Sequence, residues 1–273
     1  MTEGALSRTE PTAAEGAPLL SVRDVTAGFG ATTVLHGISF DVVPGEVCGI
    51  FGLNGAGKSV TMGVLAGIIP ARSGRIVYNG RDVTAMSAEH RVALGWGHVP
   101  QGRQVFPQLT VEENLRLGAF TLRRRNKSRY PAVLTSVLER FPILAERRTQ
   151  LAGTMSGGQQ ASLAVARALM SEPTLLFVDE PSAGLSPLAI RDLFTALKAV
   201  ADTGVSMVLV EQNVAFGLQI VDTVHVLQTG QVKLAKAVQD VDAGELGERL
   251  GVGRLLGAGI EQVLASRKGD SRG

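Results

Sequence analysis

The chain lacks several features that would assign it to a class at once. Cys48 is its single cysteine among 273 residues, so no disulfide can form within it and a reducing compartment is expected. One cysteine and four scattered histidines cannot build a zinc framework. No apolar run approaches the roughly 18 to 20 residues of a membrane span. Residues 1–18 have no apolar core, so we expect a disordered lead-in rather than a signal peptide.

An excess of charge of one sign is also missing. The 27 Lys and Arg residues nearly balance the 25 Asp and Glu residues, which leaves a formal net charge of +2. This balance argues against nucleic acid as a partner bound by bulk electrostatics. The mean hydropathy is nevertheless positive, at +0.18. Without a membrane span, that value indicates buried parallel strands or a large apolar surface for a partner.

The apolar pattern predicts strands first, then helices, and then strands that alternate with helices. The expected strands are Leu19–Val25, Ile38–Val43, Val47–Phe51, Ile76–Tyr78, Gly95–Val99, Leu175–Val178 and Ser206–Val210, followed by a hairpin of Val224–Gln228 and Gln231–Ala235. The expected helices are Ser59–Ala66, Gln160–Met170, Leu188–Ala201, and Val111–Arg140 with an interruption at the basic stretch Arg123–Arg129. The basic stretch reads as a solvated face, although it could also meet anionic lipid or RNA.

The predicted fold class is therefore α/β, with a parallel sheet flanked by helices. To this core the pattern adds an antiparallel β subdomain near the start and a helical subdomain at about residues 102–172. The main domain is expected to span residues 19–238. Residues 239–273 should form a C-terminal helical segment and a flexible tail that frays from about Ser266.

The strongest motif follows the expected strand Val47–Phe51 and opens the next helix. It fits the phosphate-loop pattern G-x-x-x-x-G-K-S/T at every fixed position, so the implied core is that of a P-loop NTPase. The nucleotide-binding residues are expected to be Gly52, Leu53, Asn54, Gly55, Ala56, Gly57, Lys58, Ser59 and Val60. Lys58 should reach the β and γ phosphates, and the Ser59 hydroxyl should ligate Mg²⁺.

A second motif places two carboxylates at the end of an apolar strand. Leu175–Val178 is followed directly by Asp179 and Glu180, at the strand edge where ligands bind in open α/β sheets. Asp179 is expected to serve the Mg²⁺ ion. Glu180 is expected to act as the general base that polarises the attacking water. The alternative is that both carboxylates only cap the strand before the Pro181 turn.

A third motif begins the helix that precedes those carboxylates. Ser156, Gly157, Gly158 and Gln159 form another potential anion site at a helix N-terminus, where a plain serine cap is the alternative. One nucleotide does not need two such termini from a single chain, whereas two chains facing each other would use both. With Met155 before it, this segment is similar to the LSGGQ signature of the ATP-binding cassette family.

The resemblance to that family covers about residues 19–237 and assigns further residues. Gln101 matches the family's glutamine loop, so the resemblance implies that it serves Mg²⁺ and the attacking water and links them to the transmembrane partner. The segment Ser182–Ser186 matches the loop that crosses the interface between two cassettes. Phe29 takes the place of the aromatic residue that stacks on adenine, although a core role is the alternative. The implied ligands are ATP and Mg²⁺.

One departure from the family pattern concerns the switch histidine. Gln212 takes its place in this chain, and an amide can bond the γ-phosphate but cannot carry a proton. The sequences around Gln212 and after Gln101 resemble the second ATPase subunit of branched-chain amino-acid importers. Those systems pair two different ATPases with two permeases and a binding protein. Val99–Arg103 and Gln159-Gln160 are also similar to ATPases of urea and short-chain amide uptake.

The favoured function is that of an ATPase subunit at the cytoplasmic face of a membrane, which drives an importer of branched-chain amino acids. A second, non-identical ATPase subunit and transmembrane permeases are the expected partners, with a solute-binding protein reached indirectly. The alternatives are a urea or short-chain amide importer, a soluble ATPase of the same family that acts in DNA repair or on ribosomes, and a weakly hydrolysing regulatory subunit. We expect Phe106, Leu109 and Val111 to expose the apolar surface that meets the permease.

Overall fold

The structure is a computed structural model that describes residues 17–251 and 257–270. The disorder expected for the lead-in therefore concerns residues that lie, for the most part, outside this description. Within the two described ranges, no helix combines the length and the apolar character needed to cross a membrane.

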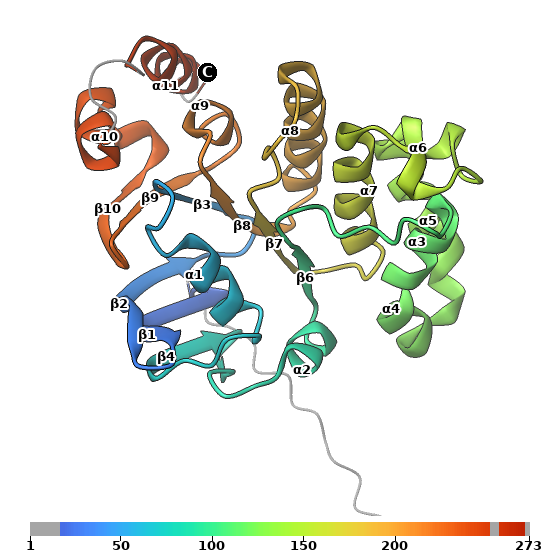
Figure 1. Ribbon diagram of the computed structural model, residues 1–273, viewed down its shortest axis with the longest axis horizontal. Coiled ribbons are helices and arrows are strands. Elements are labelled where there is room, and N and C mark those ends of the chain that lie inside the picture. Colours follow the sequence, from blue (N-terminus) through green and yellow to red (C-terminus); the bar gives the residue numbers. More distant parts are fainter. Residues whose placement is uncertain (1–16, 252–256, 271–273) are drawn as a thin grey trace, which may run out of the picture.

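A six-stranded sheet forms the centre of the molecule, with the strand order β10-β9-β3-β8-β7-β6 (Figure 1). Its strands are β3 (Val47–Phe51), β6 (Trp96–Val99), β7 (Leu175–Asp179), β8 (Ser206–Glu211), β9 (Thr223–Gln228) and β10 (Gln231–Ala237). Neighbouring strands from β9 to β6 are parallel, and β10 joins antiparallel to β9 as the expected hairpin. Every residue of β3, β7 and β8 is buried, because helices or the second sheet cover both faces. The predicted α/β fold class is confirmed.

A four-stranded antiparallel sheet packs beside the first, in the order β2-β1-β4-β5. Its strands are β1 (Leu20–Phe29), β2 (Thr32–Val42), β4 (Ser73–Tyr78) and β5 (Arg81–Asp82). Helix α1 (Lys58–Leu65) lies between the two sheets and contacts β1, β2 and β7. A continuous apolar cluster, which includes Ile38, Ile50 and Phe177, fills this space and fixes the start of α1 against the edge of the large sheet.

Helices gather on the opposite side of the large sheet (Figure 1). They are α3 (Val111–Gly118), α4 (Phe120–Arg125), α5 (Tyr130–Arg140), α6 (Pro142–Glu146), α7 (Gly157–Leu169), α8 (Pro187–Ala201) and α9 (Val214–Gly217), with short 3₁₀ turns at Lys127–Arg129, Ala152–Thr154 and Val238–Asp240. Helix α2 (Ala88–Ala93) lies on the side of α1, where Arg91 donates to the Val64 and Leu65 carbonyl oxygens. A second apolar cluster joins α3, α5, α7 and α8 to the face of the sheet. The helical region is therefore packed on the core rather than tethered to it.

The helices are interrupted within the predicted basic stretch, in its second half from Asn126 to Arg129. Arg123 to Arg125 form the last turn of α4. The helix ends at Arg125, and Asn126 is its C-cap. The guanidinium of Arg123 lies 5.5 Å from the ring centre of Tyr130, and Arg129 pairs with Glu172. At least two of the basic side chains in this stretch, Arg123 and Arg129, therefore have interaction partners within the chain.

The chain ends in α10 (Ala243–Leu250) and α11 (Gly257–Asp270). Helix α11 runs up to Asp270, through the segment from Ser266 that the sequence expects to fray. Arg267 donates a hydrogen bond to the Val221 carbonyl and lies 3.7 Å from Asp222. Ile260 and Leu264 are buried against the core, so the helix end is held by packing as well.

Candidate functional site

The glycine-rich loop between β3 and α1 has the backbone that its motif predicts. Gly55 and Gly57 adopt φ angles of +81° and +106°, in the left-handed region that disfavours other residues. Gly52 approaches the backbone of β9 so closely that a Cβ there would lie 2.4 Å from the Leu227 carbonyl oxygen. The loop can therefore curl at the N-terminus of α1, where backbone N–H groups and the helix dipole favour an anion.

Lys58 is buried at the start of α1 and makes three contacts with the chain itself. Its ammonium donates to the carbonyl oxygens of Gly52, at 2.8 Å, and Leu53, at 3.1 Å. It also lies 3.0 Å from Oε1 of Glu180, and its side chain is only 4% exposed. The lysine thus joins the loop to the carboxylates that follow β7.

Asp179 and Glu180 stand at the carboxyl end of β7, beside the loop. Asp179 is 7% exposed, and burial, together with the charge of Glu180, raises its pKa to about 6. Glu180 has a φ of +42°, an unusual angle for a residue with a side chain, and its N–H donates to the Val210 carbonyl at 2.9 Å. This conformation turns the Glu180 carboxylate back toward Lys58.

Gln101 joins the same cluster from the segment that follows β6. Its Nε2 donates to Oε2 of Glu180 at 2.9 Å. Arg103, two residues on, donates to the carbonyl oxygens of Ala183 and Gly184, each at 3.3 Å. The structure therefore brings together Lys58, Asp179, Glu180 and Gln101, four residues that the sequence places in one site.

Gln212 lies at the end of β8, next to this cluster. It lines a cavity of about 470 Å³ together with Glu180, and Gly259 and Ile260 of α11 form part of the same wall.

The sequence analysis gave no role of their own to two residues near Glu180 and Gln212. Arg103 gave no signal beyond its charge, whereas Glu211, a carboxylate that ends an apolar strand as Asp179 does, could have been found by that position.

The donor atoms fit a hard cation such as Mg²⁺. Oδ1 of Asp179 is buried and has no hydrogen-bond partner among the described residues, and Ser59 is exposed on the first turn of α1. Across the described part of the chain, no group of three His, Cys, Asp or Glu side chains could hold a metal. A metal here would have to take further ligands from phosphate and water, which is how Mg²⁺ is commonly bound.

The Ser156 signature lies apart from the P-loop. Ser156 is the N-cap of α7, its Oγ accepting from the Gln159 N–H while the Gln159 side chain accepts from the Ser156 N–H. The cavity beside the P-loop is lined by loop residues, the β9–β10 turn and the end of α10, and none of the signature residues takes part. Within one chain, the two potential anion sites do not form a single site.

Phe29 is 59% exposed at the end of β1, which excludes the core alternative. Ala27, two residues earlier, pairs with Leu35 of β2. A Cβ on Gly57 would lie 2.9 Å from the Leu35 side chain, so β2 packs directly against the P-loop. The exposed ring therefore extends from a strand pair that lies beside the loop.

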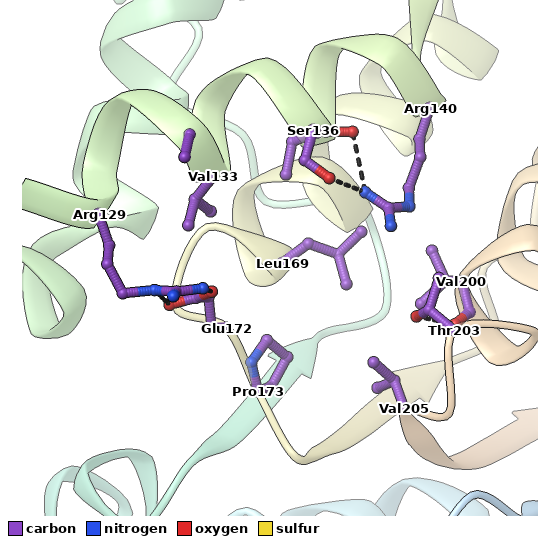
Figure 2. A pocket seen from close by; sticks show the side chains of 12 residues that line it. Arg129, Val133, Ser136, Arg140, Leu169, Glu172, Pro173, Val200, Thr203 and Val205 are labelled. Atoms are coloured by element: carbon purple, nitrogen blue, oxygen red, sulfur yellow. Dashed lines mark hydrogen bonds and ion pairs between the residues drawn. The ribbon is translucent and has the colours of Figure 1, made fainter.

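A separate cavity of about 290 Å³ lies at the opposite edge of the large sheet, where β7 and β8 begin (Figure 2). Arg129 and Arg140 face it from α5 and the turn before it. Arg129 donates to Glu172, with Nε 2.9 Å from Oε2, and Arg140 donates to Ser136. Both guanidinium groups therefore bond the chain's own acceptors at the wall of this cavity.

An apolar cleft of about 390 Å³ opens between α2, β6, α3, α4 and α7. We use that name for the cavity whose wall includes the exposed side chains Val92, Phe106, Leu117 and Phe120. The guanidinium carbon of Arg167 lies 5.2 Å from the ring centre of Phe106. The sequence prediction for this surface is right for Phe106 and wrong for Val111, which is fully buried because it starts α3 with its side chain in the helical core. Leu109 is half-buried.

Comparisons with known proteins agree with this geometry. A family model described as ABC transporter matches residues 35–183. The chain is 42% identical to the high-affinity branched-chain amino acid transport ATP-binding protein BraG of Pseudomonas aeruginosa, over 78% of this chain and 91% of that protein. It is 33% identical to a probable branched-chain amino acid transport ATP-binding protein, LivF, of Archaeoglobus fulgidus, over 86% and 99%. A crystal structure of the ADP conformation of an ATP-binding cassette of an ABC transporter superposes with a TM-score of 0.72 at 26% identity, over 81% of this chain and 91% of that one.

Proposed function

The chain belongs to the ABC transporter family as an ATPase that binds ATP and couples its hydrolysis to transport, and from this premise we propose that it drives the uptake of branched-chain amino acids. The observation that carries the solute class is the 42% identity to BraG, a protein named for that transport, over 91% of its length. The same name appears on the LivF relative, which the chain covers almost completely.

The proposed nucleotide site is built on the P-loop. Backbone N–H groups of Gly52 to Val60 hold the phosphates, Lys58 contacts the β and γ phosphates, and Phe29 stacks on the adenine. The Ser59 hydroxyl and Asp179 would hold Mg²⁺, which supplies charge neutralisation on the phosphate oxygens. The buried, unpartnered Oδ1 of Asp179 supports this assignment.

The proposed hydrolytic residues surround the position of the γ-phosphate. Glu180 takes the proton of the attacking water as general base, and Gln101, which donates to its carboxylate, helps to orient that water. Gln212 bonds the γ-phosphate from the end of β8. Lys58 must exchange Glu180 for phosphate when ATP binds, because the two side chains are paired at 3.0 Å.

The second ATPase subunit is proposed to complete the site. The signature residues Ser156 to Gln159 do not line the chain's own P-loop cavity, so the phosphate on that loop would meet the signature of another chain. We place a non-identical cassette opposite this one, since Gln212 replaces the switch histidine and a different partner can supply a site that keeps it.

The apolar cleft is proposed as the docking surface for a transmembrane permease. Its wall includes His98 of β6 and Phe106, which flank the segment with Gln101 in the sequence, so a permease element seated there would contact both ends of the segment that reaches Glu180. Its side chains Phe106, Leu117 and Phe120 are exposed and apolar, as a buried interface core requires. Through this contact the subunit is peripheral on the cytoplasmic face of the membrane.

A transport assay tests the solute class. Cells that express the chain with its co-encoded permeases and binding protein should accumulate labelled leucine and valine, and cells with Lys58→Ala in this chain should not. The binding protein should also stimulate ATPase activity with leucine. Uptake of urea or acetamide in place of leucine would replace the proposal with the amide importer.

A membrane-pelleting assay tests the docking surface. Phe120→Ser removes a ring that is 61% exposed in the apolar cleft, and it should shift the chain from the membrane pellet to the supernatant when permeases are co-expressed. Val43→Ser is the matched control, because Val43 is 44% exposed on the turn before β3, outside the cleft. Equal pelleting of the two variants would exclude the cleft as the contact.

A further inference from the structure

Glu211 is a carboxylate that the chain buries completely. It is the last residue of β8 and its exposed fraction is 0%. Burial raises its pKa, while hydrogen bonds from the Ser182, Gln212 and Asn213 segments lower it. It forms no ion pair with a Lys, Arg or His side chain in the parts of the chain that the structure covers. Backbone amides, and not a cation, therefore compensate for the burial of this group.

Those amides come from two loops. Oε1 of Glu211 accepts from the Ser182 N–H at 3.0 Å, and Oε2 accepts from the N–H groups of Gln212 and Asn213, each at 2.9 Å. Ser182 lies two residues after Glu180, in the loop that follows β7. Gln212 and Asn213 form the loop that follows β8. Oε1 of Glu211 therefore binds the loop after β7, and Oε2 binds the loop after β8.

Each loop adjoins or carries a proposed hydrolytic residue, Glu180 or Gln212, and both of these residues line the same cavity. Glu180 lies two residues before Ser182, whose N–H donates to Glu211, and the N–H of Gln212 donates to Glu211 as well. The Glu211 carboxylate therefore fixes the separation between the two segments that carry Glu180 and Gln212. Only an ionised carboxylate offers acceptors on both of its oxygens. An amide in its place would present one oxygen and one NH₂ group, and the NH₂ group would face a backbone N–H.

We propose that Glu211 is a positioning residue for ATP hydrolysis, which sets Glu180 and Gln212 at the spacing needed to act on the γ-phosphate together. It acts through backbone geometry and touches neither the nucleotide nor the water. The inference rests on the ATPase activity of the chain and on the proposed roles of Glu180 and Gln212, and it is independent of which solute is carried.

Glu211→Gln tests the bonding directly in the full-length chain. Hydrogen exchange followed by mass spectrometry should show the amides of at least one loop, either Ser182 or Gln212 and Asn213, exchanging at least about tenfold faster than in the parent, because the amide side chain can hold only one of the two loops. This measurement needs neither permease nor solute, so it remains informative if the amino-acid assignment fails. Unchanged exchange at both loops would overturn the proposal.

Turnover in the assembled transporter tests the consequence. Glu211→Gln should lower kcat by about tenfold or more and leave the KM for ATP within about twofold, since the P-loop contacts are untouched. Glu46→Gln is the matched control: Glu46 is a carboxylate, 9% exposed, that accepts from the Val43 N–H at 2.7 Å at the far edge of the sheet. It should lower thermal stability without changing kcat. An equal kcat loss in both variants would reduce Glu211 to a structural role.

A double-mutant cycle separates positioning from general loosening. If Glu211 acts in part through Gln212, then Glu211→Gln should cost less kcat in a Gln212→Ala background than in the parent. Glu211→Asp keeps the charge but is one methylene shorter, so it should give an intermediate kcat, and it provides a second variant if Glu211→Gln does not fold. Full additivity, or a kcat for Glu211→Asp equal to that of the parent, would contradict the proposal.

Discussion

Asp179→Asn should stabilise the fold at neutral pH while it removes metal-dependent nucleotide binding. The pKa of Asp179 is about 6 in the folded chain and 3.8 as its ordinary value, chiefly because the carboxylate is buried and lies beside Glu180. The protonated form is therefore favoured in the folded state. The stability that this proton contributes is complete below pH 3.8 and is lost as the pH rises through about 6.

The size of the effect follows from the two pKa values. At 1.36 kcal/mol per pKa unit, the ionised carboxylate costs the fold about 3 kcal/mol above pH 7, and about half of this loss falls between pH 5 and pH 8. Asparagine does not ionise, so the variant escapes that loss. Its advantage in free energy of unfolding over the parent should be about 1 kcal/mol larger at pH 8 than at pH 5, which corresponds to roughly 3 °C in Tm.

Urea denaturation of the parent and the variant at both pH values measures this difference directly. Other titrating groups are common to the two proteins and largely cancel. Asp202→Asn on the exposed end of α8 is the control for the removal of a carboxylate from the surface. ATP with Mg²⁺ should raise the Tm of the parent and not that of Asp179→Asn. A gap that is equal at pH 5 and pH 8, or larger at pH 5, would refute the reasoning.

Three further substitutions test the site. Lys58→Ala should abolish tight ATP binding in a calorimetric titration, since the phosphates lose the buried ammonium; Lys198→Ala on the surface of α8 should bind as the parent does, and retained affinity in Lys58→Ala would contradict the site. Glu180→Gln should stop turnover because an amide cannot serve as general base, and it should bind ATP at least as tightly because Lys58 loses its competing carboxylate; measurable steady-state hydrolysis would exclude Glu180 as the base. Gln212→His should raise the ATPase rate of the assembled transporter modestly if the glutamine limits hydrolysis, and a collapse of the rate would show that the glutamine is required.

The motifs predicted from sequence are those whose function depends on local backbone. The P-loop, the strand that ends in Asp179, and the capped start of α7 are each set by a few neighbouring residues, so their spacing alone locates them. The alternation of apolar runs likewise predicts the parallel sheet and the β9–β10 hairpin. These features need no knowledge of what packs against them.

The features that the sequence did not reveal depend on partners far along the chain. Val111 is expected on an exposed apolar surface, yet the helical core buries it. Arg267 holds the end of α11 only because Val221 lies opposite. The role of Glu211 requires that the loops after β7 and β8 lie side by side, a consequence of strand order that residue spacing does not encode. Pairing between adjacent strands thus created contacts that no local pattern could indicate.

The contacts of Lys58 have a consequence for the protein at rest. Its ammonium is occupied by Gly52, Leu53 and Glu180, while Gln101 occupies the other oxygen of Glu180. In the proposed mechanism, Lys58 contacts the phosphates and Glu180 activates the water. In the structure, these two side chains bind each other. The Lys58–Glu180 pair therefore has to break before either side chain can act on a nucleotide. When the phosphates of ATP bind Lys58, the Glu180 carboxylate loses this partner and becomes available to the attacking water.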